Sequence, residues 1–268
     1  MEILPRIRKW FLKEFRRKKI SIVLLVLAVY TPQLWAQQYL TLGVGYSTAF
    51  LGSDELNLFK ETYNAVYYPL LREGMRGFGA SVGLQWEIGY RRMGRLATAF
   101  LFGAQNHSGQ DIAQFYNGDS RRLKIDIQSY YIECEMGRTF KNIYVNGLLT
   151  LFFKREITLY SVASQLQPKE ALGGTYEGIT SVSTDLGVAI GYFKDPIFLT
   201  CKITYPLFTG GGSTALRDNS PEKFRERTYF FPDDYEAYLS GGFFHGVKCN
   251  IDGLKILVMA AFAIKIKK

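Results

Sequence analysis

The chain has 268 residues and a mass of 30.6 kDa, with 21% charged residues, 47% hydrophobic residues and a mean hydropathy of −0.04. These values exclude a disordered polymer and a membrane protein built from several long apolar helices. The formal net charge is +9, but residues 1–19 contribute eight basic and two acidic side chains, which leaves +3 for the remainder. The positive charge is therefore concentrated at the N-terminus and does not indicate nucleic-acid binding.

The first 36 residues have the three parts of a secretory signal peptide. The basic segment is followed by an apolar run over residues 20–30, and Ala36 is a small residue suited to cleavage. The apolar run is shorter than the roughly 20 residues that a membrane-spanning helix needs. We therefore predict a signal peptide over residues 1–36 and a mature domain over residues 37–268. The alternative is an uncleaved N-terminal anchor, which the long basic segment would also suit.

From residue 37 onward, apolar and polar residues alternate, which is typical of β-strands with one apolar face. In the clearest segment, Phe78 to Tyr90, every second residue is apolar and the residues between are small or polar. Eight such segments are predicted at residues 39–50, 78–90, 96–106, 122–137, 143–157, 180–193, 197–207 and 254–266. In the fourth segment the apolar residues change from odd to even positions, which predicts a β-bulge near Gln128–Tyr130.

The connections between these strands alternate in length. Short turns are expected at residues 91–95, 138–142 and 194–196, and long connections at residues 51–76, 107–121, 158–179 and 208–250. This alternation is typical of outer-membrane barrels, whose short turns are periplasmic and whose long loops are extracellular.

Three shorter patterns lie within the long connections. Helical spacing predicts a helix over Tyr63–Leu71 in the first of them, and residues 233–239 suggest a short helix in the last. Residues 239–247 also alternate, but a ninth strand would place the two termini on opposite sides of a membrane. We therefore leave residues 239–247 in the last loop.

The predicted fold class is all-β: an eight-stranded antiparallel up-and-down transmembrane β-barrel with long extracellular loops and both termini in the periplasm. Strands this long suit a tilted crossing of a bilayer, which takes about 9–11 residues. In lipid each strand must pair on both sides, because no water satisfies an open edge. The apolar faces then contact acyl chains, and eight strands leave an interior that side chains fill. Aromatic residues near strand ends fit an interfacial girdle: Trp86, Tyr90, Tyr192 and Tyr205.

Charged residues on the predicted inward face are the candidate site. They are Glu87, Glu133, Glu135, Asp185, Lys202 and Lys255, with Lys124 and Asp126 nearer a rim. Mixed charges in a narrow interior must pair, because an isolated buried charge is costly. We interpret them as a plug of salt bridges that holds the strands in register. The alternative is a proton or ion path, or a gated pore.

Catalytic and metal-binding signals are weak. His107, Ser108 and Asp111 are close in sequence in the second long connection, and His245 lies in the fourth. A Ser–His–Asp arrangement needs those groups within hydrogen-bond reach, and two histidines in polar loops are usually solvated. We expect no enzymatic activity, no metal site and no cofactor.

The signal peptide, the eight alternating strands and the long outer loops together resemble the small outer-membrane β-barrel proteins of Gram-negative bacteria. The Tyr-rich composition and the Lys-Ile-Lys-Lys end are similar to the Bacteroidetes-type members. The resemblance covers residues 37–268, is architectural and includes no short diagnostic motif. Members of this group include structural anchors, adhesins, small transporters and accessory parts of secretion systems, so the resemblance implies a location and a fold more than a function.

We therefore expect a non-enzymatic scaffold of the cell envelope. Its partners would be outer-membrane lipid and another envelope or surface protein bound through the loops, with no nucleic acid. The alternatives are a narrow porin-like channel or transporter, a barrel-embedded lipid-modifying enzyme, and a soluble periplasmic β-protein that binds a ligand.

Overall fold

The chain from Gln37 onward folds as an antiparallel β-sheet that closes on itself. The computed structural model describes residues 36–163, 174–180, 182–211, 215–218 and 247–266. The predicted signal peptide lies outside these residues except for Ala36. The short helix expected over residues 233–239 and the alternating stretch over residues 239–247 also lie outside them, apart from Val247.

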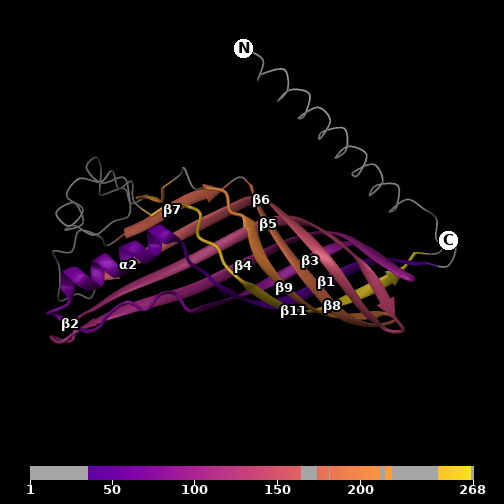
Figure 1. The fold of residues 1–268 in the computed structure, drawn as a ribbon, viewed down its shortest axis with the longest axis horizontal. Coiled ribbons are helices and arrows are strands. Elements are labelled where there is room, and N and C mark those ends of the chain that lie inside the picture. Colours follow the sequence, from indigo (N-terminus) through magenta and orange to yellow (C-terminus); the bar gives the residue numbers. More distant parts are fainter. Residues whose placement is uncertain (1–35, 164–173, 181, 212–214, 219–246, 267–268) are drawn as a thin grey trace, which may run out of the picture. The chain divides into compact units, whose positions relative to one another are not determined.

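One helix and eleven strands make up the described part of the chain (Figure 1). In chain order they are β1 (Gln37–Phe50), α2 (Asp54–Tyr67), β2 (Leu71–Glu73), β3 (Ala80–Met93), β4 (Leu96–Phe115), β5 (Ser120–Phe140), β6 (Ile143–Ala163), β7 (Gly174–Thr180), β8 (Ser183–Lys194), β9 (Ile197–Phe208), β10 (Arg217–Asp218) and β11 (Lys255–Lys265).

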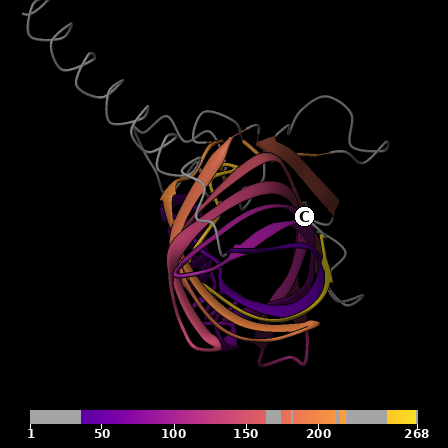
Figure 2. The ribbon, with the colours of Figure 1, turned by 90° about the vertical axis from the view of Figure 1, so that its right-hand side faces the viewer.

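Eight of the strands form a closed ring, which we call the barrel. In hydrogen-bonded order they are β1, β3, β4, β5, β6, β8, β9 and β11, and β11 pairs again with β1. Figure 2 shows the strands arranged around this ring. All these pairings are antiparallel, and each strand of the ring lies beside the previous one in the chain. The predicted all-β class and the ring of eight strands are confirmed.

Beyond the barrel, β4, β5 and β6 continue as a three-stranded sheet. These strands have 20, 21 and 21 residues, and only residues 116–119 separate β4 from β5. The long connection expected at residues 107–121 is therefore wrong as a loop, and so are the parts of residues 158–179 that belong to β6 and β7; residues 164–173 lie outside the described residues. β2 pairs with the far part of β4, β7 pairs with the far part of β6, and β10 pairs with β7. These strands, α2 and the far ends of β4, β5 and β6 are called the extension below.

β4, β5 and β6 are longer than predicted because they continue from the barrel into the extension. The side chains on their inner face change from polar to apolar along the way. In β5 every odd residue from Arg121 to Glu135 is buried. Leu123, Ile125 and Ile127 lie in the extension, whose inside is largely apolar, and Glu133 and Glu135 lie in the barrel, whose inside is polar. A change of environment therefore produces the change from odd to even positions, and the prediction of an extra residue in β5 near Gln128–Tyr130 is wrong.

The irregularity falls on the partner strand. Tyr130 pairs with Lys154 and Tyr131 pairs with Phe152, so Phe153 is an extra residue in β6. One extra residue moves every following side chain of a strand to the opposite face.

Helix α2 packs against the inward apolar residues of the extension. Ser53 caps its N-terminus by accepting a hydrogen bond from the Leu56 N–H at 3.1 Å, and the next two residues are acidic. The C-cap residue Tyr68 still has helical backbone angles, and Pro69 after it has no N–H with which to continue the helical hydrogen bonds. The helix predicted over Tyr63–Leu71 is thus present but begins nine residues earlier and ends at Tyr67. Among the described residues, no helix combines the length and the apolar composition needed to cross a membrane.

Candidate functional site

All six charged residues predicted on the inward face lie inside the barrel. Each is at most 5% exposed and each makes an ion pair; they are Glu87, Glu133, Glu135, Asp185, Lys202 and Lys255. Strand alternation puts them there, because successive side chains point to opposite faces. Lys124 and Asp126 instead face outward and pair with each other at 3.2 Å, so their predicted inward position is wrong.

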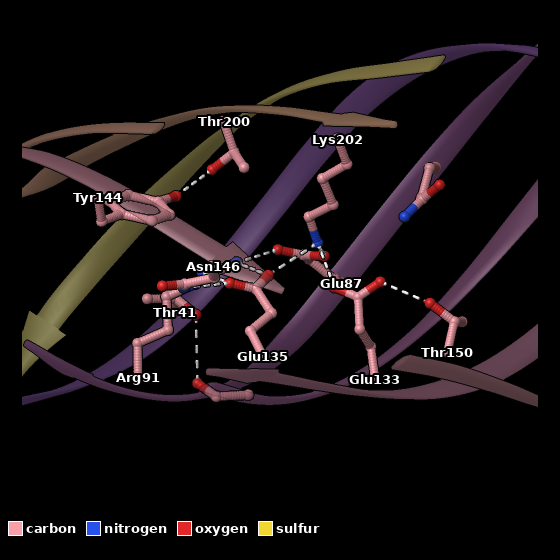
Figure 3. Close-up of polar contacts among 12 residues, drawn as sticks. Thr41, Glu87, Arg91, Glu133, Glu135, Tyr144, Asn146, Thr150, Thr200 and Lys202 are labelled. Carbon is pink, nitrogen blue, oxygen red and sulfur yellow. Dashed lines mark hydrogen bonds and ion pairs between the residues drawn. The ribbon is translucent and has the colours of Figure 1, made fainter. Parts of the chain in front are cut away.

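Five of the buried side chains form what we call the Lys202 network: Glu87, Arg91, Glu133, Glu135 and Lys202 (Figure 3). Lys202 Nζ lies 2.7 Å from Glu87 Oε2 and 2.6 Å from Glu133 Oε1, with Glu135 Oε1 at 3.3 Å. Arg91 Nη2 lies 2.8 Å from Glu87 Oε1, and Arg91 Nη1 lies 2.9 Å from Glu135 Oε2. Burial strengthens these attractions and makes any unpaired charge costly.

The three carboxyl groups of this network have different partners. Glu87 and Glu135 each contact both cations, and Asn146 Nδ2 also donates to Glu135 Oε2 at 3.0 Å. Glu133 contacts Lys202 alone among the cations, and its Oε2 lies 2.9 Å from Thr150 Oγ1 (Figure 3). Glu133 therefore has the weakest electrostatic compensation of the three.

A second buried group, the Lys255 network, consists of Arg155, Asp185, Asp252 and Lys255. Lys255 Nζ lies 2.6 Å from Asp185 Oδ2 and 2.7 Å from Asp252 Oδ1. Arg155 Nη1 lies 2.6 Å from Asp252 Oδ2. Two cations thus face two carboxylates, and the charges of this network balance.

A polar cavity of about 20 Å³ lies between the two networks. Glu133 and Lys202 line it from one network, Asp185 and Lys255 from the other, and Thr150 lies between them. The volume is enough for about one water molecule. Asp185 Oδ1 is buried and makes no hydrogen bond to another described residue, so it offers an acceptor to such a water.

Aromatic rings fill the barrel at the end with the short turns. The Phe193 and Phe198 rings stack with centroids 4.2 Å apart, and Tyr39 meets both rings edge-on at 5.0 and 5.8 Å. The Arg91 guanidinium lies 5.6 Å from the Phe198 centroid, which joins this cluster to the Lys202 network. Gly103 leaves room for the Tyr131 ring farther along the interior, because a Cβ there would collide with the phenol.

Sequence reasoning missed three members of the networks: Arg91, Arg155 and Asp252. Arg91 was expected in a turn, but β3 continues to Met93. Alternation along β6 would point Arg155 outward, and the extra residue Phe153 turns it inward. An arginine on an otherwise apolar outer face was the available signal for that bulge.

His107 lies on β4 inside the barrel, not in a loop, so its predicted solvated position is wrong. Its Nε2 lies 2.9 Å from Ser47 Oγ. Ser108 alternates to the outer side of the strand, and Asp111 accepts hydrogen bonds from the backbone N–H groups of residues 76 and 77 at 3.1 and 2.8 Å. The structure therefore does not bring His107, Ser108 and Asp111 together as a catalytic triad.

The environment of His107 predicts a pH-dependent stability. Desolvation, followed by the positive charges of Lys255 and Arg155, lowers the pKa of His107 to about 4. The unfolded chain binds this proton near pH 6.5, so the stability contributed by neutral His107 is complete above that pH and is lost as the pH falls toward 4. We expect the free energy of unfolding to drop by about 3 kcal/mol over this range relative to His107→Gln, which does not titrate. Denaturant titrations of both proteins across the range check this, and parallel pH profiles would contradict it.

The three cysteines of the chain are free thiols. Burial raises the pKa of the Cys249 thiol to about 11, which makes it a poor nucleophile. Cys134 and Cys201 face outward on apolar strand faces. Within the described ranges, no group of three or more His, Cys, Asp or Glu side chains is placed to hold a metal ion. His245 lies outside those ranges.

The outer surface of the barrel is apolar on all eight strands; we call it the belt. Its side chains are 39–66% exposed and include Leu42, Val44, Leu84, Trp86, Ile88, Phe100, Phe102, Met136, Leu149, Leu151, Val188, Ile190, Leu199, Ile203, Val258 and Phe262. Tyr90, Tyr192 and Tyr205, predicted with Trp86 as an aromatic girdle, are exposed on the same face. The barrel thus has charges inside and apolar side chains outside.

The belt ends at one level on β4, β5 and β6. Directly beyond it the outward residues are polar or charged, and apolar residues return on this face only farther along, at Tyr160 and Val162 of β6. The polar and charged residues are Asn106, Ser108, Gln110, Lys124, Asp126, Gln128, Lys154, Glu156 and Thr158. A row of aromatic rings follows the boundary, with centroid distances of 6.0 Å for Trp86–Phe102, 5.9 Å for Phe102–Phe153 and 6.4 Å for Phe153–Tyr130. The outer surface therefore becomes polar where the inner surface becomes apolar.

No protein-family model and no curated protein matches the chain. Among solved structures, the crystal structure of Ail, the attachment invasion locus protein of Yersinia pestis, in complex with the heparin analogue sucrose octasulfate, matches with a TM-score of 0.38 and 8% sequence identity. The match covers 85% of this chain and 99% of Ail. A likeness this slight says nothing about what the present chain binds.

Proposed function

We propose that this chain is a non-enzymatic outer-membrane β-barrel, whose belt contacts lipid and whose extension presents a surface for partners. The observation that carries the proposal is the belt: an apolar surface on every strand of a closed ring that keeps its charges inside. A barrel that is stable in water has the reverse arrangement, because a contiguous apolar surface of this extent drives association. The closed ring suits lipid, since every strand of it pairs on both sides.

The height of the belt supports this reading. On β6 the belt runs from Ile143 to Phe153, and a tilted strand needs about 9–11 residues to cross the hydrocarbon core. The spanning part of β4 ends before Asn106, where the outward residues become polar. His107 and the extension therefore lie beyond the hydrocarbon layer. The apolar core of the extension is that of a protein domain in water.

The orientation follows from the predicted signal peptide. Export would place the start of β1 in the periplasm, and the end of β11 lies beside it because Tyr39 pairs with Lys265. The short turns lie at this end, where Arg138, Lys141 and Lys194 are exposed and suit the phosphates of lipid headgroups. The extension then faces the outside of the cell, where it can bind a surface or envelope protein.

The filled interior favours a scaffold over a narrow channel. The aromatic cluster, the two ion-pair networks and the apolar core of the extension follow one another along the inside of the fold. The cavity between the networks has room for about one water molecule. We propose that these side chains plug the barrel and fix the register of its strands.

The proposal predicts that Trp86 touches acyl chains. Trp86 is the sole tryptophan of residues 37–268 and is 42% exposed on the belt. After refolding of residues 37–268 into vesicles, we expect Trp86 emission to be blue-shifted and mostly quenched by lipids brominated along their acyl chains. Aqueous iodide should leave it nearly unchanged.

A matched control variant carries its single tryptophan in the extension. Tyr116 lies in the β4–β5 turn and is 74% exposed, so Tyr116→Trp combined with Trp86→Phe places the single tryptophan away from the belt. Its emission should respond to iodide and not to brominated chains. Emission from Trp86 that responds to iodide and ignores brominated lipid would refute contact between the belt and lipid.

A further inference from the structure

The Lys202 network contains one more carboxyl group than it has cations. Its five side chains, three carboxyl groups with Arg91 and Lys202, are each at most 3% exposed. If all of them were ionised, one negative charge would remain in a part of the barrel from which bulk water is excluded. The Lys255 network across the cavity has no positive charge to spare, because its two cations already face two carboxylates. A buried carboxylate without compensation takes up a proton.

The contacts identify which carboxyl group is neutral. Glu87 has a cation on each oxygen, and Glu135 receives Arg91, Lys202 and Asn146. Glu133 has one cation, on Oε1, while its Oε2 faces the Thr150 hydroxyl, which can accept a hydrogen bond as well as donate one. A protonated Glu133 keeps both contacts: Oε1 accepts from Lys202 and the Oε2–H donates to Thr150.

We propose that Glu133 is a buried proton-binding site, occupied in the folded protein at neutral pH. Glu133 and Thr150 both line the water-sized cavity, which gives the proton a place to exchange with a water molecule. The proposal counts charges inside the barrel and does not depend on what the belt contacts. The titratable and charged groups that face Glu133 from the surrounding strands are Glu87 and Arg91 on β3, Tyr131 and Glu135 on β5, Asp185 on β8, Lys202 on β9 and Lys255 on β11.

Infrared spectroscopy of the whole protein tests the proton directly. At neutral pH the wild-type protein should show the C=O band of a protonated carboxyl group that is hydrogen-bonded and shielded from bulk water. Glu133→Gln should lack this band, because its carboxamide has the size of the protonated carboxyl but a different absorption. Asp126→Asn, which removes a carboxylate on the outer side of β5, should retain it.

The unfolding rate of two variants is the second measurement. We expect Glu133→Gln to unfold within about twofold of the wild-type rate, because the amide still accepts from Lys202 and donates to Thr150. Glu135→Gln should unfold at least about tenfold faster, because its amide offers a donor where Arg91 and Asn146 need an acceptor. A wild-type spectrum without the band overturns the proposal whether or not the variants fold, and so does a Glu133→Gln protein that unfolds as fast as Glu135→Gln. Trp86 quenching on the same samples separates a failure of lipid contact from a failure of the proton site.

Discussion

Replacing Lys202 by methionine is expected to lower the free energy of unfolding by about 3–5 kcal/mol, the range found when one partner of a buried ion pair is removed. Methionine has similar length and no charge, so Glu87 and Glu135 would share Arg91 as their cation and Glu133 would have none. Protonation would relieve part of the repulsion, but Glu87 Oε2 and Glu133 Oε1 would still lose their donor. Denaturant titration of the protein in vesicles measures this loss of stability. The folded fraction is read from the heat-dependent gel mobility of the barrel.

A surface lysine is the matched control. Lys154 pairs with Glu156 at 2.7 Å, but the two side chains are 48% and 38% exposed. Exposed pairs contribute about 0–1 kcal/mol, so Lys154→Met should leave the unfolding midpoint almost unchanged. If both methionine variants lost the same stability, the buried network would not be what stabilises the barrel.

Replacing Phe59 by alanine is the second substitution with a large expected effect, about 3–5 kcal/mol. Phe59 is fully buried on α2, and its ring stacks on Tyr63 with centroids 6.1 Å apart. The alanine would leave a cavity between the helix and the inner side of the extension. Because α2 does not belong to the ring, the loss should appear first as faster proteolysis within Asp54–Tyr67, with the heat-modifiable mobility of the barrel retained.

The neighbouring residue Leu58 provides a control that separates the loss of packing from other effects of an alanine substitution in α2. Leu58 is on the same helix and is 39% exposed, so Leu58→Ala changes helix composition and side-chain size without opening a cavity. We expect it to change the proteolysis rate by less than about twofold. Equal sensitivity of the Phe59 and Leu58 variants would argue against packing of α2 into the extension.

The sequence predicted the barrel well, because a period of two leaves a direct signal. Every strand of the ring overlaps a predicted segment, and the alternation of residues 78–90 assigned Glu87 inward and Trp86 outward as the structure has them. The same reasoning identified six buried charges of the networks. It found them because a charged residue within an alternating strand must lie on the face opposite the apolar residues.

The sequence did not predict the extension, and the reason is physical. In the part of β5 that precedes Ser129, the polar residues face outward and the apolar residues face inward. A rule that assigns every apolar face to the outside therefore fails there. The phase change was visible in the sequence and was interpreted as a bulge. The actual bulge at Phe153 depends on the pairing of β6 with β5, which one strand's sequence does not contain. Arg155 was missed for the same reason.

The reversal of inner and outer chemistry along β4, β5 and β6 imposes an order of assembly. Leu123 of β5 belongs to the same buried apolar cluster as Leu56 and Phe59 of α2, and the ring sets the alignment of β5 with β6. We therefore expect the ring to close before the extension packs, so that the protein folds from the ring outward.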